Sequence, residues 1–151
     1  MARKLVEIPR DYLILMMEIG YVLLAMQRFE EAFEVFEGVH HLAPNSDVPR
    51  IAMGNTYSAQ EKFDEAIREY KKALKIVSDS ALAHAHLGEA YLMKNDKTKA
   101  NDFIQKAMDL DPNGKSGAFA RQLMDAMEKG LLPISEEMKK DLIETAALLE
   151  K

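Results

Sequence analysis

The stretch GNTYSAQEKFDEAIREYKKAL, residues 54–74, decides the fold of this 151-residue chain. Its second half places apolar side chains three and four residues apart, which is the spacing of one face of an amphipathic helix. Its first half ends at Gln60-Glu61-Lys62, a polar triplet that suits a short turn. The stretch therefore predicts two helices, and so short a connection makes them antiparallel.

The same pattern recurs 34 residues before and 34 residues after this stretch. Small residues keep the step, at Gly20, Gly54 and Gly88 and at Ala32, Ala66 and Ala100. Large residues keep it too, at Phe36, Tyr70 and Ile104. A glycine on the first helix and an alanine on the second let the two helices approach closely, while the larger residues fill the gaps. Because one pair cannot bury its apolar face alone, we expect the repeats to stack into a superhelix with a shared core.

Helix-stopping and helix-capping residues separate the repeats, at Pro44-Asn45-Ser46-Asp47, Ser78-Asp79-Ser80 and Asp111-Pro112-Asn113-Gly114. The segment 115–129 predicts a further helix with Phe119, Leu123, Met124 and Met127 on its buried side. The segment 135–150 predicts a last helix, capped by Ser135, with an apolar face of Met138, Leu142, Ala146 and Leu149. This last helix has three possible places: on the array, in a groove, or against another copy.

Composition excludes several classes of protein. The net charge of −5 argues against a nucleic-acid surface. The absence of cysteine excludes disulfides, thiolate metal sites and a cysteine nucleophile. The first nine residues lack the long apolar core of a secretory signal, so we expect a cytoplasmic protein. The apolar run 12–26 is shorter than the roughly 20 residues of a membrane span and contains Glu18, so we expect no membrane insertion.

This spacing, with its glycine, alanine, tyrosine and phenylalanine positions, resembles the tetratricopeptide repeat. In that frame the single domain 1–151 has repeats at 13–46, 47–80 and 81–114, a capping helix at about 115–129 and a C-terminal helix at about 135–150. The resemblance implies an all-α solenoid of three helix-turn-helix repeats plus these two helices. The chain departs from the family where an aromatic residue usually opens the first helix, since Met16, Arg50 and His84 stand there.

The resemblance also implies a concave groove, lined by the first helices of the repeats, that receives a peptide. The frame places these residues in it: Ile14, Met17, Tyr21, Leu24, Val48, Ile51, Ala52, Asn55, Leu82, Ala85, His86, Glu89, Leu92 and Met93. Because most of them are apolar, we expect an amphipathic helix or an extended apolar segment as the ligand. The alternative is that some of them are core, covered by a neighbouring helix or by the C-terminal helix.

Other functions find little support in the sequence. Co-chaperones of the large heat-shock proteins clamp a C-terminal carboxylate from this groove, but the matching places hold Met17, Tyr21, Ala52, Leu82 and His86, which cannot form that clamp. His40, His41, His84 and His86 lack the i, i+4 spacing of a metal site. Phosphate-binding loops and nucleophile elbows are absent. We therefore expect no enzyme activity, no cofactor and no metal.

The architecture, the apolar groove, and the run Glu18-Ile-Gly-Tyr21 followed by Phe29-Glu-Glu-Ala32 resemble the chaperones of type III secretion systems. Because the first repeat begins near residue 13, the chain is closer to the needle-subunit chaperones than to the translocator chaperones. The alternative is a scaffold or assembly adaptor in a larger complex. A homodimer is possible through the apolar surface of the first helix or through the tail 135–151.

Overall fold

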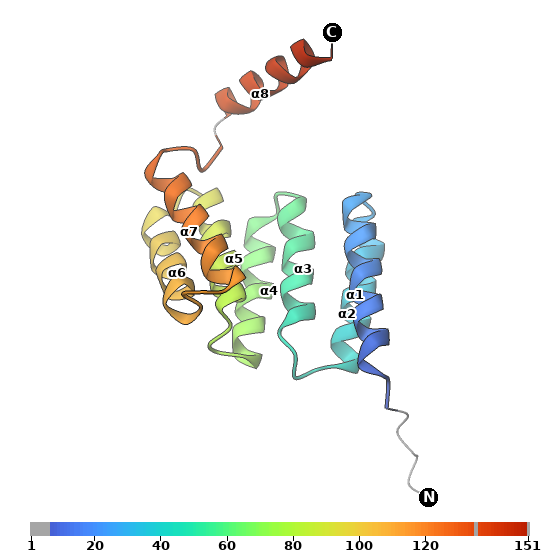
Figure 1. Ribbon diagram of the computed structural model, residues 1–151. Helices are drawn as coiled ribbons and strands as arrows, with labels where there is room; N and C mark the ends of the chain where they lie inside the picture. The colour runs from blue at the N-terminus through green and yellow to red at the C-terminus, as the bar shows by residue number, and fades with distance from the viewer. Residues whose placement is uncertain (1–6, 135, 151) are drawn as a thin grey trace, which may run out of the picture.

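The computed structural model describes residues 7–134 and 136–150 as a row of helices without a strand. Successive helices run antiparallel and stack side by side from α1 at one end to α7 at the other (Figure 1). The predicted all-α solenoid of three helix pairs, a capping helix and one further helix is confirmed. The helices are α1 Arg10–Ala25, α2 Phe29–Leu42, α3 Val48–Ala59, α4 Phe63–Ile76, α5 Ala81–Met93, α6 Lys97–Leu110, α7 Lys115–Glu128 and α8 Glu136–Leu149.

The repeating glycines mark the closest approach of the two helices in each pair. A Cβ atom added to Gly54 would lie 2.3 Å from Cε1 of Tyr70, and one added to Gly20 would lie 2.3 Å from Cε1 of Phe36. At Gly88 the nearest atom is Cγ1 of Ile104, at 2.5 Å. Each glycine therefore makes room for the large side chain that the same repeat carries on its second helix.

The turn inside each pair repeats with the same step of 34 residues. Gln27, Glu61 and Asn95 adopt left-handed backbone with φ of 58°, 58° and 62°. Asparagine tolerates this conformation, whereas it strains glutamine and glutamate. The peptide N–H that follows each of these residues bonds back to the first helix, as Lys62 N does to Tyr57 O at 3.0 Å.

Caps between the pairs use the polar residues that the sequence placed there. Oγ of Ser80 accepts a hydrogen bond from the Ala83 N–H at 3.2 Å. Oδ2 of Asp111 accepts from the Ser116 N–H at 3.0 Å, which ties the start of α7 to the end of α6. These bonds satisfy N–H groups that a helix start otherwise leaves without a partner.

The buried apolar residues form two separate clusters. The smaller cluster joins the first pair to α3 through Ala32, Phe36, Ala52 and Met53. The larger cluster runs from Ile51 through the second and third pairs to Leu123 of α7. Phe119, Met124 and Met127 of α7 pack against it, so α7 covers the end of the array as predicted.

The last helix, α8, extends away from the array beyond α7 (Figure 1). Nζ of Lys139 in its first turn lies 3.2 Å from Oε1 of Glu61 in the α3–α4 turn. Leu142 and Leu149, on the predicted apolar face, are exposed to solvent. The predicted cap Ser135 lies outside the described residues. In the part of the chain that is described, no helix has the length and apolar character that crossing a membrane requires.

Candidate peptide-binding groove

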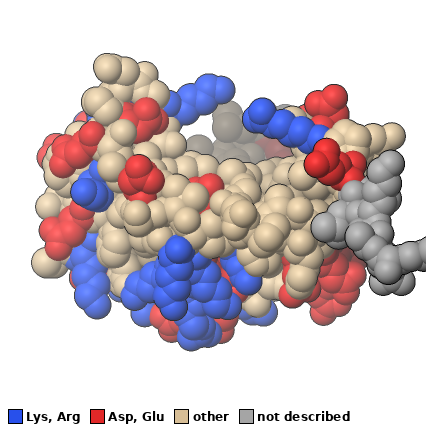
Figure 2. Space-filling model, turned by 90° about the horizontal axis from the view of Figure 1, so that it is seen from below, with Lys and Arg blue, Asp and Glu red and all other residues tan. Residues whose placement is uncertain are grey.

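The first helices of the three pairs, α1, α3 and α5, are neighbours and carry the residues of the candidate groove. Seen from below, charged side chains gather toward the edges of the molecule, and a mostly uncharged band crosses its middle (Figure 2). The surface therefore separates polar from apolar regions. That separation is typical of proteins that bind other polypeptides.

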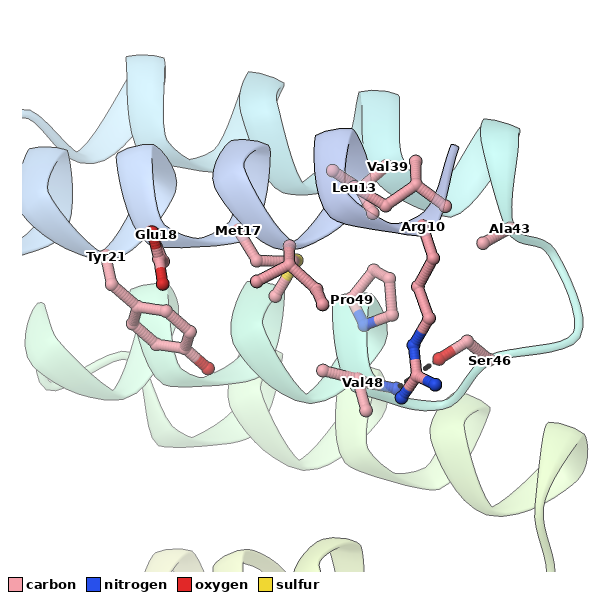
Figure 3. A pocket seen from close by; sticks show the side chains of 11 residues that line it. Arg10, Leu13, Met17, Glu18, Tyr21, Val39, Ala43, Ser46, Val48 and Pro49 are labelled. Atoms are coloured by element: carbon pink, nitrogen blue, oxygen red, sulfur yellow. Dashed lines mark hydrogen bonds between the residues drawn. The ribbon is translucent and has the colours of Figure 1, made fainter. Parts of the chain in front are cut away.

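A pocket of about 470 Å³ opens between α1, the end of α2 and the start of α3. Four of the sequence-predicted residues meet there, namely Ile14, Met17, Tyr21 and Val48. Figure 3 shows Tyr21 and Glu18 toward one end of the pocket and Arg10 at the other, with Met17 and Pro49 between them. The pocket thus has an apolar middle with a cation and a carboxylate at its ends.

The sequence frame did not identify six residues of this pocket: Arg10, Leu13, Val39, Ala43, Ser46 and Pro49. Arg10 and Leu13 lie at or before the expected start of the first repeat, and the other four belong to α2, to α3 and to the connection between them. The Ser46 side chain also shapes this connection, because its Oγ accepts a hydrogen bond from the Val48 N–H at 3.3 Å. The proline and the polar residues at 44–47 were the available signal, because a loop that turns between two helices can close one end of a pocket.

A polar link crosses the candidate groove at Asn55. Oδ1 of Asn55 accepts a hydrogen bond from the Tyr70 hydroxyl at 2.7 Å. Burial raises the pKa of the Tyr21 hydroxyl, and a hydrogen bond with Asn55 opposes part of that rise. Burial and the nearby Glu89 carboxylate raise the pKa of Tyr70 far above its ordinary value. Both tyrosines are therefore neutral donors at physiological pH.

His86 stands between two aromatic rings at the other end of the groove. Its ring stacks on Tyr70 with 5.4 Å between centroids, and it meets the ring of Phe119 at 5.1 Å. Its Nδ1 lies 3.2 Å from Oε2 of Glu89. The aromatic packing and this contact explain the presence of His86 without a metal or a catalytic role. No group of three or more acidic or histidine side chains in the described residues could hold a metal ion.

The remaining predicted residues lie at different depths. Ile51, Ala52, Ala85 and Leu92 are fully buried, because the helices packed on both sides of α3 and α5 cover them. Leu24, Leu82 and Met93 are half-buried. The first group supports the groove from beneath, so a ligand would reach the exposed residues of α1 and the half-buried ones of α3 and α5.

Comparison with protein families gives two matches, one to the family described as TPR repeat over residues 54–95 and one to the tetratricopeptide repeat over residues 81–113. The chain contains tetratricopeptide repeats. It is 38% identical over 81 residues to an uncharacterized protein, ycf37, of Cyanophora paradoxa, which is 54% of this chain and 45% of that protein. It is 23% identical over 95 residues, 63% of this chain and 18% of the relative, to subunit 6 of the anaphase-promoting complex of Arabidopsis thaliana. The chain spans less than half the length of these two relatives.

Among solved structures, the fold is similar to that of the type III secretion translocator chaperone SycD of Yersinia enterocolitica. The TM-score is 0.71 with 19% identity, over 82% of this chain and 92% of SycD. A second structure holds SycD in complex with a peptide of the translocator YopD, with a TM-score of 0.66, 19% identity, and coverage of 82% and 98%. SycD belongs to the translocator class, which the start of the first repeat had made the less similar one.

Proposed function

We propose that this protein binds an amphipathic or extended apolar segment of another polypeptide in the groove of α1, α3 and α5. The observation that carries the proposal is the open pocket whose apolar middle is formed by Ile14, Met17 and Val48. An apolar side chain of a ligand would be buried there, and burial of apolar surface is the main favourable term in such association.

The ends of the pocket suit an amphipathic ligand. Arg10 offers a cation at one end and Glu18 a carboxylate at the other. Beyond the pocket, Asn55 and Glu89 present polar atoms next to apolar neighbours. These groups fit the polar face or the main chain of a peptide, and they set its direction more than its affinity.

The finer proposal is a cytosolic chaperone of a type III secretion substrate. An export substrate that inserts in membranes or polymerises exposes an apolar helix before export. Covering that helix in the groove prevents its aggregation by competitive burial. The fold that this chain shares with SycD, a translocator chaperone, supports this choice.

The alternative is an assembly adaptor that joins subunits of a larger complex. The similarity to a subunit of the anaphase-promoting complex favours this function. Both functions use a binding groove and no catalytic group. Neither needs a cofactor, and the polar side chains Asn55, Tyr70 and Glu89 serve as structural and contact groups in both.

Co-purification of the tagged full chain from its native cells, followed by mass spectrometry, tests the groove. Ile14→Glu places a charge in the pocket, and Leu42→Glu is the matched control because Leu42 is a similarly exposed apolar residue outside it. The expected result is a partner that is lost with Ile14→Glu and kept with Leu42→Glu, both variants being folded by circular dichroism. Retention of the partner by both variants would contradict the groove proposal.

The identity of the partner separates the two functions. A small helical protein that aggregates when produced alone and stays soluble with this chain supports the chaperone. A set of subunits that co-purify in fixed ratio, each soluble alone, supports the adaptor and excludes the chaperone.

A further inference from the structure

The outer face of α1 carries a row of exposed apolar side chains, separate from the groove. The row, here called the α1 stripe, repeats at steps of four and three residues. Such a spacing forms a straight seam along a helix. Its members are 47–62% exposed: Tyr12, Leu15, Ile19, Val22 and Met26.

The corresponding positions of the other repeats show what this face is built for. Leu15, Ile19 and Val22 are 50%, 47% and 59% exposed. The residues 34 and 68 positions later in the chain are all less than 2% exposed: Pro49 and Ala83, Met53 and Leu87, Thr56 and Ala90. The α1 stripe is therefore the same surface that the fold buries completely in the second and third repeats.

A helix covers that surface in each inner repeat. The second helix of one pair packs on the first helix of the next, so α2 lies on α3 and α4 lies on α5. No described helix takes this place on α1, which stands at the end of the array (Figure 1). Because the α1 stripe continues an interface that the protein already uses twice, the occupant that fits it is a helix with one apolar face.

α8 is a helix with such a face and without a place in its own array. Leu142 and Leu149, one heptad apart on the same face, are 60% and 83% exposed. Its 14 residues span about 20 Å, close to the length of the α1 stripe. In its own chain α8 lies beyond α7, at the opposite end from α1 (Figure 1).

The sequence explains why α8 does not pack on α7 as a second helix normally would. Asp141 stands at the position where the three repeats carry Val39, Ala73 and Ala107. Those three residues are buried in the helix pairs. A carboxylate at that position opposes the same packing, because it would be buried without a partner.

We propose that α8 of a second copy of this chain lies along the α1 stripe, as α2 lies on α3. Exchange in both directions closes a pair of chains. The proposal is independent of the groove function, because Ile14, Met17 and Tyr21 lie on another side of α1 and line the pocket.

Disulfide cross-linking of full-length chains tests the contact directly, since the protein has no cysteine of its own. Ile19→Cys lies in the middle of the stripe, and Leu142→Cys lies on the apolar face of α8. Mixing the two variants under mild oxidation is expected to give a covalent pair with at least tenfold higher yield than either variant alone. Leu148→Cys is the matched control: it is exposed on another face of α8 and is expected to cross-link poorly.

Three outcomes would overturn the proposal. Ile19→Cys alone linking as well as the mixture would assign the stripe to α1 of the second copy. A chain with both cysteines that forms only a link within itself would assign it to its own α8. Absence of a link in every sample, with the parent chain monomeric in sedimentation at about 100 times the concentration used for mixing, would leave no contact.

A second measurement separates loss of contact from loss of fold. Val22→Glu is expected to shift the parent from a dimer to a monomer in sedimentation equilibrium, with its circular dichroism unchanged. Leu42→Glu, on α2, is expected to leave the dimer intact. A Val22→Glu chain that stays folded and dimeric would contradict the proposal.

Discussion

The Tyr70 hydroxyl donates a hydrogen bond to Oδ1 of Asn55 at 2.7 Å, and this bond ties α4 to the groove side of α3. Asn55 also bonds with Tyr21 of α1. One amide therefore connects side chains from the first two repeats. It lies between the pocket at α1 and the aromatic cluster around His86.

Tyr70→Phe keeps the ring and removes this bond. Because Tyr70 is fully buried, the Asn55 oxygen loses a partner that water replaces poorly. We expect the free energy of unfolding to fall by about 1 kcal/mol in urea denaturation. Tyr57→Phe, which removes a hydroxyl that makes no such bond in the described residues, is the control. Equal losses in the two variants would show that the bond to Asn55 does not stabilise the fold.

Gly54→Ala should destabilise the array. The added methyl group would lie 2.3 Å from the Tyr70 ring, which is buried and cannot move aside. Overpacking of this kind lowers the free energy of unfolding by about 1–3 kcal/mol, measurable by thermal or urea denaturation.

Gly38→Ala is the matched control, because nothing lies within 4 Å of a Cβ atom there. Gly38 is inside α2, and alanine favours a helix over glycine by up to about 1 kcal/mol. The two substitutions are therefore expected to change stability in opposite directions. A loss of similar size at both positions would contradict the close approach seen at Gly54.

Arg50→Ala should destabilise the protein by about 2 kcal/mol, because it removes a cation beside a buried carboxylate. Nη1 of Arg50 lies 3.0 Å from Oε2 of Glu69, which is 6% exposed. Arg28→Ala breaks a pair with Glu31 that is fully exposed and is expected to change stability much less. Urea denaturation of both variants checks this, and equal effects would contradict it.

The pH dependence of stability should include a contribution from His40. Burial, followed by the charge of Arg50, lowers the pKa of His40 below its ordinary value. Its Nδ1 is buried with no hydrogen-bond partner, so the protonated form has a donor without an acceptor. As the pH falls through about 6.5, the unfolded chain binds the proton first, and the folded state loses stability.

The measurement is the free energy of unfolding at about pH 7.5 and about pH 5.5, on either side of the ordinary histidine pKa. His40→Gln should lose less stability between these two values than the parent chain does. Parallel losses in the parent and the variant would show that His40 does not contribute.

The sequence was sufficient for the helix pairs because their packing depends on local spacing. The 34-residue step of Gly20, Gly54 and Gly88 had one physical meaning, the close approach of two helices, and the structure confirms it. The turns at Gln27, Glu61 and Asn95 fell where polar residues interrupted the apolar pattern. Periodicity carries this kind of information well.

The depth of the candidate groove residues depended on neighbours that periodicity does not reveal. Ile51 and Leu92 share a helix face with groove positions, yet each is covered by helices on both sides. Ile14 and Val48 stay open because α1 has a neighbour on one side only. The position of a repeat in the array, more than its residues, decided which side chains a ligand can reach.

The division of the core into two clusters also divides the folding cooperativity of the chain. Phe36 and Met53 hold the first repeat through a small cluster, while the larger cluster unites everything from Ile51 to Leu123. In a repeat array, stability is nearly a sum over units and their junctions, so the unit with the fewest buried neighbours opens first. Slow hydrogen exchange would then be found in α4 to α6 and faster exchange in α1. The pocket is built on the repeat that opens most readily, and a ligand that fills it would act as the missing part of that repeat's core.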